Sequence, residues 1–263
     1  MSKLTDKLEK VGQQTAAPLG FGSASKKDAA NPALMIIGRG TPAELSKKTA
    51  TSGDSIDAYV VELSSWTKAT VEKVATALKD KVWGVRIPSI TEDQTAALKK
   101  LGGDFAVLDI GTTPAAVLND EDIGIFVTLG PDLDEDDARA IHELPMDGIF
   151  FRPHKDLFPV TMKSLLALLK TRSYIDKFLI MEAPASLTQG DLETLRNIGA
   201  AAIATDAKAT KELKATKTAI VNLPKPKTKG RDRSIALVPQ SAHSHDEHSH
   251  DHDDDDYEDD EDY

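Results

Sequence analysis

The chain has 263 residues, 40% of them hydrophobic and 29% charged, so it can build one large α/β domain or two small ones around a sizeable core. It contains no cysteine, which excludes a disulfide scaffold, a cysteine-ligated metal site and a thiol nucleophile, and fits a cytoplasmic location. No apolar run approaches the roughly 20 residues that cross a bilayer, and no secretory signal is evident, so we expect no membrane partner.

The net charge of −11 is concentrated at the C-terminal end of the sequence. Residues 241–263 hold twelve Asp and Glu and no Lys or Arg. Without those twelve, 31 of the 43 acidic residues remain against 32 Lys and Arg. The rest of the chain is therefore nearly neutral and offers no electrostatic basis for nucleic-acid binding.

The N-terminal extension, residues 1–32, has two parts. Residues 1–14 can form an amphipathic helix with Leu4, Leu8 and Val11 on one face. Such a helix would dock on the body or cap the bottom of a barrel, or else bind a partner. Residues 15–32 are rich in Ala, Gly, Ser, Lys and Pro, which predicts an irregular lead-in.

Residues 33–218 contain eight short apolar runs separated by helix-sized stretches. The runs are Ala33–Ile37, Ala58–Val61, Val82–Val85, Phe105–Leu108, Ile123–Val127, Gly148–Phe151, Phe178–Met181 and Ala201–Ala204. Helix starts are marked by Thr41, Thr67, Thr91, Thr113, Asp134 and Thr188, two of them in the capping boxes Thr41–Glu44 and Thr91–Gln94. Gly102 and Gly199 mark helix ends. The pattern is one of alternating strands and helices.

The runs are continuously apolar, which is typical of parallel strands buried on both faces. An open doubly wound sheet and a closed barrel both fit this pattern, but no Gly-rich dinucleotide loop follows the first run. Eight units in sequence favour a (β/α)₈ barrel. Every second residue of a strand faces the same side, so residues two and four positions before an inward-facing charged strand end also face inward. This places Gly84, Gly124 and Gly148 inside the barrel, beside large residues such as Phe105 and Phe126, as a filled interior requires.

The strand ends carry the candidate site, because barrels place ligands at the carboxyl ends of their strands. Three arginines could hold an anion, and Asp109 and Glu182 are the candidate catalytic carboxylates. The other candidate ligand-binding residues are Arg39, Glu62, Arg86, Thr128, Arg152, His154 and Asp206. Alternatively, these charges satisfy one another in salt bridges and only seal the barrel end.

Several barrel chemistries lack their residues in this sequence. No His-x-His follows the first run, no lysine ends a strand, and only Asp109 is acidic among strands three to five. A metal-dependent amidohydrolase, a Schiff-base aldolase and an enolase-like magnesium site are therefore disfavoured. No cofactor is identified for the barrel.

Residues 219–240 form a basic linker with one short apolar segment, Ser234–Val238, and residues 241–263 a low-complexity tail that we expect to be disordered. The tail alternates acidic residues with five histidines: His243, His245, His248, His250 and His252. Imidazole and carboxylate groups bind nickel and zinc, so the tail could buffer metal; a merely solubilising role is the alternative.

The strand–helix units resemble the TIM-barrel superfamily, on Leu34–Gly38, Trp83–Val85 and the passage Leu192–Ala200. More narrowly, Trp83–Val85 and the lead-in Pro18–Gly22 look like a bacterial barrel-like family to which no reaction is assigned. That resemblance carries no functional residues. The tail is similar in composition to the metal-buffering tails of some metallochaperones.

Three functional hypotheses follow from these patterns. The first is a degenerate or non-catalytic barrel that binds a small anionic ligand or a protein partner at the strand ends. The second is a barrel enzyme, an isomerase, lyase or aldolase, acting on a small anionic metabolite. The third is buffering of a divalent transition metal by the tail. The oligomeric state is left open.

Overall fold

The computed structural model describes residues 2–12, 31–46, 54–154 and 157–224. Most of the predicted lead-in, the apolar segment Ser234–Val238 and the His-rich tail lie outside these ranges. Within the described part, no helix is long and apolar enough to span a membrane.

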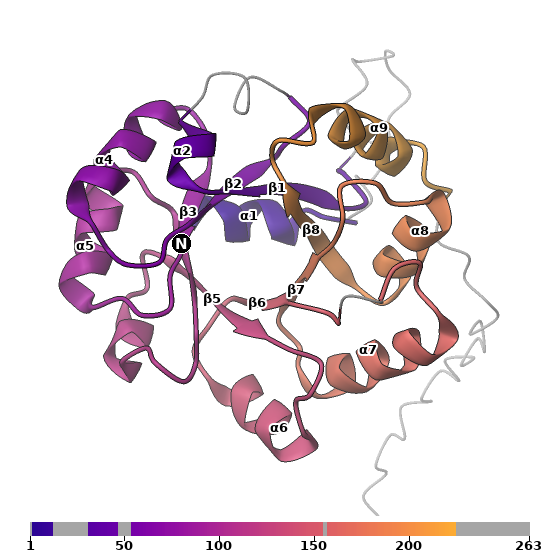
Figure 1. Ribbon diagram of the computed structural model, residues 1–263. Coiled ribbons are helices and arrows are strands. Elements are labelled where there is room, and N and C mark those ends of the chain that lie inside the picture. The colour runs from indigo at the N-terminus through magenta and orange to yellow at the C-terminus, as the bar shows by residue number, and fades with distance from the viewer. Residues whose placement is uncertain (1, 13–30, 47–53, 155–156, 225–263) are drawn as a thin grey trace, which may run out of the picture. The chain divides into compact units, whose positions relative to one another are not determined.

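Eight parallel strands form a closed barrel, each hydrogen-bonded to the next and the last to the first (Figure 1). The strands are β1 Met35–Gly40, β2 Ala58–Glu62, β3 Trp83–Arg86, β4 Phe105–Leu108, β5 Gly124–Leu129, β6 Gly148–Phe151, β7 Phe178–Glu182 and β8 Ala200–Asp206. Pairing of β8 with β1, with Arg39 beside Asp206, closes the ring. The predicted (β/α)₈ barrel is thus confirmed.

Helices surround the barrel in sequence order (Figure 1). They are α2 Pro42–Leu45, α4 Lys68–Ala77, α5 Glu92–Lys100, α6 Glu135–Glu143, α7 Met162–Tyr174, α8 Gln189–Asn197 and α9 Thr210–Val221. The segment expected to start at Thr113 is instead a short 3₁₀ helix, η1 Ala115–Asn119, and 3₁₀ helices commonly serve as such short connections. Helix α9 runs three residues past the expected barrel end at 218.

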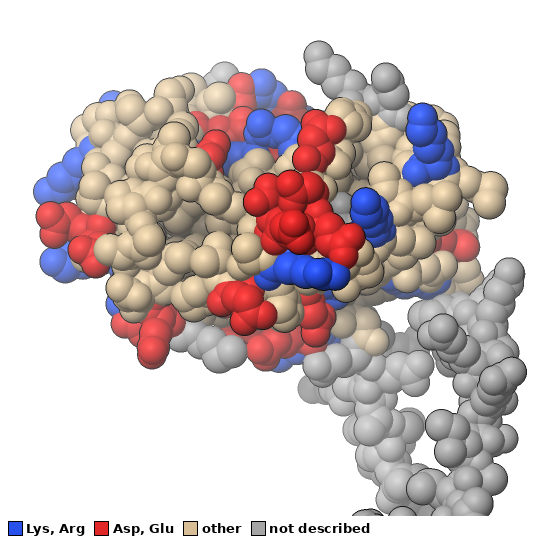
Figure 2. Space-filling view, turned by 90° about the horizontal axis from the view of Figure 1, so that it is seen from below, with Lys and Arg blue, Asp and Glu red and all other residues tan. Residues whose placement is uncertain are grey.

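Local signals set most helix boundaries. In α5 the Thr91 and Gln94 side chains each accept a hydrogen bond from the other residue's backbone N–H, and Gly102 follows with φ +85°. Thr67 precedes α4 but makes no side-chain capping bond. Helix α6 begins with three acidic residues after the capping Asp134, which suits the positive end of the helix dipole. Figure 2, seen from the side on which α6 lies, shows acidic side chains gathered on this face.

The barrel interior alternates large and small side chains, as the strand parity predicted. Phe105, Phe126 and Phe150 pack edge to face, with ring centroids 5.8 Å apart in both pairs. The glycines make room for these rings. A Cβ on Gly84 would lie 2.2 Å from the Phe105 carbonyl oxygen, and one on Gly148 would lie 2.8 Å from the Phe126 ring.

Helix α1, Lys3–Glu9, closes the N-terminal end of the barrel. Leu4 and Leu8 are 0% and 2% exposed, within the same interior cluster as the three phenylalanines. The Asp104 carboxylate accepts the backbone N–H groups of Lys3 and Leu4, each at 2.8 Å. The N-terminal helix therefore packs on the barrel and presents its apolar face inward, although it ends at Glu9 rather than residue 14.

Candidate functional site

The carboxyl ends of the strands bring the predicted charged residues together on one side of the barrel. Arg39, Glu62, Arg86 and Glu182 belong to strands whose preceding inward positions fill the interior core, so the same parity turns these side chains toward the barrel axis. Arg152 follows β6 directly. Arginine side chains at the carboxyl ends of the strands are long enough to reach residues on strands across the barrel.

Glu182 is the centre of this cluster. Its side chain is only 9% exposed and lies against three guanidinium groups. Arg39 Nη1 donates to Glu182 Oε2 at 2.8 Å, Arg86 Nη1 donates to Oε1, and Arg152 Nε lies 3.5 Å from Oε2. A buried carboxylate needs such partners, because an unpaired charge away from water is costly. The three guanidinium groups therefore compensate the buried charge of Glu182.

The remaining contacts of the cluster leave arginine donors in excess. Arg86 Nη2 donates to Thr128 Oγ1 at 2.9 Å, and Arg39 Nη1 lies 3.5 Å from Glu62 Oε1. The Glu62 side chain is 41% exposed. Three guanidinium groups thus face two carboxylates, and Arg39 Nε is buried with no hydrogen-bond partner in the described part of the chain. The predicted salt-bridge network exists, but it does not neutralise itself.

Arg152 is the least engaged arginine of the cluster. Its side chain is 58% exposed, and its 3.5 Å approach to Glu182 is its only ion pair with a described residue. No hydrogen bond from its guanidinium to another described residue is present. Its Nη groups therefore have no acceptor among the described residues, and a planar guanidinium is suited to bind a carboxylate or phosphate through two parallel bonds.

Two open cavities meet at Arg152. The larger, about 400 Å³, has polar walls that include Glu62, Ser64, Arg86, Asp109, Thr128 and Arg152. The smaller, about 270 Å³, is lined by Arg39, Arg152, His154, Phe158, Glu182 and Pro184, among others. Volumes of a few hundred Å³ are in the range of small-molecule sites. The strand ends are therefore not sealed.

Three predicted site residues lie apart from the arginine cluster. Asp109 is exposed in the larger cavity, where its Oδ1 accepts the Gly111 N–H at 2.9 Å. Asp206 forms the same local turn with the Lys208 N–H, also at 2.9 Å, but does not line either cavity. His154 is 68% exposed and lies 3.6 Å from Asp132.

Sequence reasoning missed part of the cavity wall. Thr41 lines the larger cavity although it was interpreted only as a helix cap, and Ser64 and Ile87 line it from the loops after β2 and β3. Only their position just past a strand end could have indicated them. None of these three residue types signals a site by itself.

The five tail histidines lie outside the described residues. Within residues 2–12, 31–46, 54–154 and 157–224, no group of three or more His, Asp or Glu could hold a metal ion. The hypothesis of a metal site therefore continues to concern the tail histidines alone, which lie outside the described residues.

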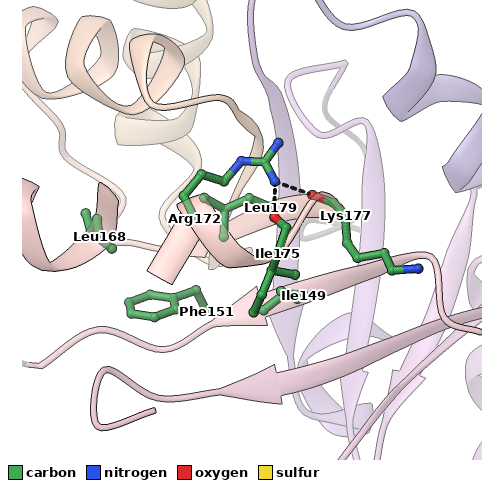
Figure 3. Close-up of a pocket in the computed structure, with 7 residues that line it drawn as sticks. All are labelled: Ile149, Phe151, Leu168, Arg172, Ile175, Lys177 and Leu179. Atoms are coloured by element: carbon green, nitrogen blue, oxygen red, sulfur yellow. Dashed lines mark hydrogen bonds between the residues drawn. The ribbon is translucent and has the colours of Figure 1, made fainter. Parts of the chain in front are cut away.

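A third hollow lies on the outer side of β6 and β7, under α7 (Figure 3). It is apolar and has room for about 10 Å³, scarcely one water molecule. Arg172 crosses it and donates to the carbonyl oxygens of Ile175 and Lys177, the latter at 3.3 Å. These bonds tie the end of α7 to the connection that leads into β7, so we assign this hollow to packing and not to ligand binding.

The sequence matches no protein-family model and no curated protein. Solved structures with the same fold include a mutant tryptophan synthase alpha-subunit from Pyrococcus furiosus, with TM-score 0.57 and 10% identity over 72% of this chain and 97% of that one. The tryptophan synthase complex of that organism gives 0.52 and 10%, over 73% and 95%. The HpcH/HpaI aldolase from Desulfitobacterium hafniense DCB-2 gives 0.49 and 13%, over 73% and 94%. At 10% identity, the two tryptophan synthase structures support the TIM-barrel fold alone, and the aldolase, with a TM-score below 0.5, carries no argument.

Proposed function

We propose that the barrel binds a small anionic ligand at the carboxyl ends of its strands. The observation that carries this proposal is Arg152, a half-exposed guanidinium at the meeting point of two cavities with no hydrogen bond to another described residue. Arg86 and Thr128 line the same wall of the larger cavity. A ligand carboxylate or phosphate there would offset the excess positive charge of the arginine cluster.

Titration calorimetry with inorganic phosphate, succinate and butyrate tests this proposal. We expect wild-type protein to bind at least one of these anions, and Arg152→Gln to weaken that binding about tenfold or more, which corresponds to about 1.4 kcal/mol. Lys170→Gln on α7 is the control, since it removes an exposed positive charge from a residue that lines neither cavity. Absence of heat with every anion, or equal weakening by both variants, would count against the site.

Binding without turnover also agrees with the likeness to a bacterial barrel-like family of no assigned reaction, which rests on Trp83–Val85 and Pro18–Gly22. A protein partner of anionic character would use the same arginines. A competition experiment relates the two possible occupants. A small anion should displace a bound protein partner only if both use Arg152.

A barrel enzyme of the isomerase, lyase or aldolase class is the second candidate. Asp109 supports it, as an exposed carboxylate that lines the larger cavity and forms no ion pair with a described residue. A carboxylate beside a bound anion can remove a proton from an adjacent carbon. Incubation with 2-oxo acids in D₂O, followed by ¹H NMR, should show deuterium incorporation that Asp109→Asn abolishes; no incorporation above that of buffer would remove the candidate.

Metal buffering by the tail is a separate proposal, supported by the five histidines among twelve acidic residues. Calorimetry with Ni²⁺ and Zn²⁺ should show binding by the full chain and none by a chain that ends at Gln240. Equal binding by both chains would contradict the proposal.

A further inference from the structure

The larger cavity carries opposite charges on two of its walls. One wall holds Arg152 and the Arg86 guanidinium, which hydrogen-bonds Thr128 at the end of β5 and Glu182 at the end of β7. The other wall holds Glu62 from β2 and Asp109 from the end of β4. Arg86 lies beside Glu62 in the strand register, but its guanidinium bonds Thr128 and Glu182 and forms no ion pair with Glu62 or Asp109, all of which are described residues.

The two carboxylates have unused capacity to accept hydrogen bonds. Asp109 accepts one backbone N–H, from Gly111, and pairs with no Lys or Arg of the described chain. Glu62 has a single ion pair among these residues, a 3.5 Å contact with Arg39, and its side chain is 41% exposed. An ionised carboxylate has about four acceptor sites, so both groups can receive donors from a ligand.

We propose that the ligand is a small zwitterion, with its anionic group at Arg152 and a cationic donor group, such as an ammonium, toward Asp109 and Glu62. This inference rests on the proposed anion binding and specifies the other end of the ligand. Two carboxylates in the same cavity weaken the binding of a plain anion, whereas a ligand ammonium would form charge-assisted hydrogen bonds with them and so strengthen binding. Leu63, Ile87 and Pro88, also in the wall, suit a short methylene chain between the two ends.

Matched ligand pairs test the inference directly. Calorimetry would compare glycine, β-alanine, 4-aminobutyrate, 5-aminovalerate and 6-aminohexanoate with the carboxylates of equal chain length that lack the ammonium. We expect at least one amino acid to bind about tenfold more tightly than its partner, a difference of about 1.4 kcal/mol. The chain length at which the affinity of the amino acid most exceeds that of its partner then indicates the distance between the two charged walls of the cavity.

The variants Asp109→Asn and Asp206→Asn form a matched pair. Both aspartates accept the backbone N–H two residues later at 2.9 Å, but only Asp109 lines the cavity. We expect Asp109→Asn to bring the affinity ratio of the best pair toward one, and Asp206→Asn to leave it unchanged. Equal effects of the two variants would overturn the assignment of Asp109.

The outcomes separate this inference from the function on which it rests. If wild-type protein binds plain carboxylates as tightly as the amino acids, the zwitterion is wrong and anion binding stands. If 4-hydroxybutyrate binds as tightly as 4-aminobutyrate, a neutral hydrogen-bond donor is sufficient and the proposal of a cationic group is wrong. If neither ligand family nor phosphate binds, both proposals fail together.

Discussion

The two ends of this barrel are closed in different ways. At the N-terminal end, Leu4 and Leu8 of α1 fill the interior, and Asp104 takes up backbone N–H groups of the same helix. At the C-terminal end, three arginines converge on Glu182 and leave open cavities beside them. The N-terminal end is filled mainly by apolar side chains, whereas the arginine cluster ends with Arg152, whose only ion pair with a described residue is its 3.5 Å contact with Glu182.

The physical consequences of the two closures differ as well. Burying a leucine side chain contributes about 1.5–3 kcal/mol, so α1 stabilises the fold. Buried ion pairs contribute little net stability, because the cost of desolvation offsets their attraction. Net stability therefore does not explain the charges at the C-terminal end of the barrel, whereas the proposed ligand binding does. In TIM barrels generally, residues at the N-terminal ends of the strands contribute to stability, and active sites lie at the C-terminal ends.

The largest expected effect is at Glu182. Glu182→Gln leaves three guanidinium groups around a neutral amide, and removal of one partner from a buried ion pair typically costs about 3–5 kcal/mol. Urea unfolding measures the loss. Glu62→Gln is the control and should cost at most about 1 kcal/mol, because that side chain is 41% exposed. Similar losses for both variants would show that burial of Glu182 is unimportant.

Leu8→Ala tests the opposite end of the barrel. The side chain is 2% exposed, and a buried leucine truncated to alanine leaves a cavity that costs about 2–5 kcal/mol. Leu166→Ala on α7 removes the same atoms from a side chain that is 69% exposed and should change stability by less than about 0.5 kcal/mol. A Leu8→Ala protein as stable as Leu166→Ala would mean that α1 does not close the barrel in solution.

Asp104→Ala should have a smaller effect, about 1–3 kcal/mol, because it removes the acceptor of the Lys3 N–H and leaves the Leu4 N–H with only its 3.2 Å bond to Ser2 Oγ. Hydrogen exchange should show faster exchange of the Lys3 amide, whose acceptor is Asp104. Asp104→Asn keeps one acceptor oxygen and should recover part of the stability. Protection of that amide in the alanine variant would contradict the capping role.

The smallest expected effect is acid sensitivity through Asp191 near the C-terminal end. Burial raises the pKa of this carboxyl, but hydrogen bonds from Thr188 and from the Val160 N–H outweigh burial and hold the pKa below its ordinary value of 3.8. A lowered pKa in the folded state stabilises the protein above the ordinary value, and this contribution is lost as pH falls through the folded value. Asp191→Asn should therefore be less stable than wild type at pH 7, with a gap that narrows below about pH 4. A gap that does not depend on pH would contradict this explanation.

Much of the fold could be predicted because its determinants are local. Apolar runs such as Ala58–Val61 mark strands whatever surrounds them, and Thr91 with Gln94 forms its capping box within four residues. Strand parity placed Gly84 and Gly148 beside phenylalanine rings, since alternation along a strand is a property of the backbone. The identities of the strand-end charges were also visible in advance.

The sequence by itself determined the order of strands and helices and the set of charges at the strand ends. Only the tertiary structure decided which charges meet, because closure of the barrel brings β1, β3 and β6 within arginine reach of Glu182 on β7. It also decided that α1 packs inward, a choice that amphipathicity leaves open. Asp109 and Asp206 look alike in sequence, and only the position of a cavity between distant loops distinguishes them.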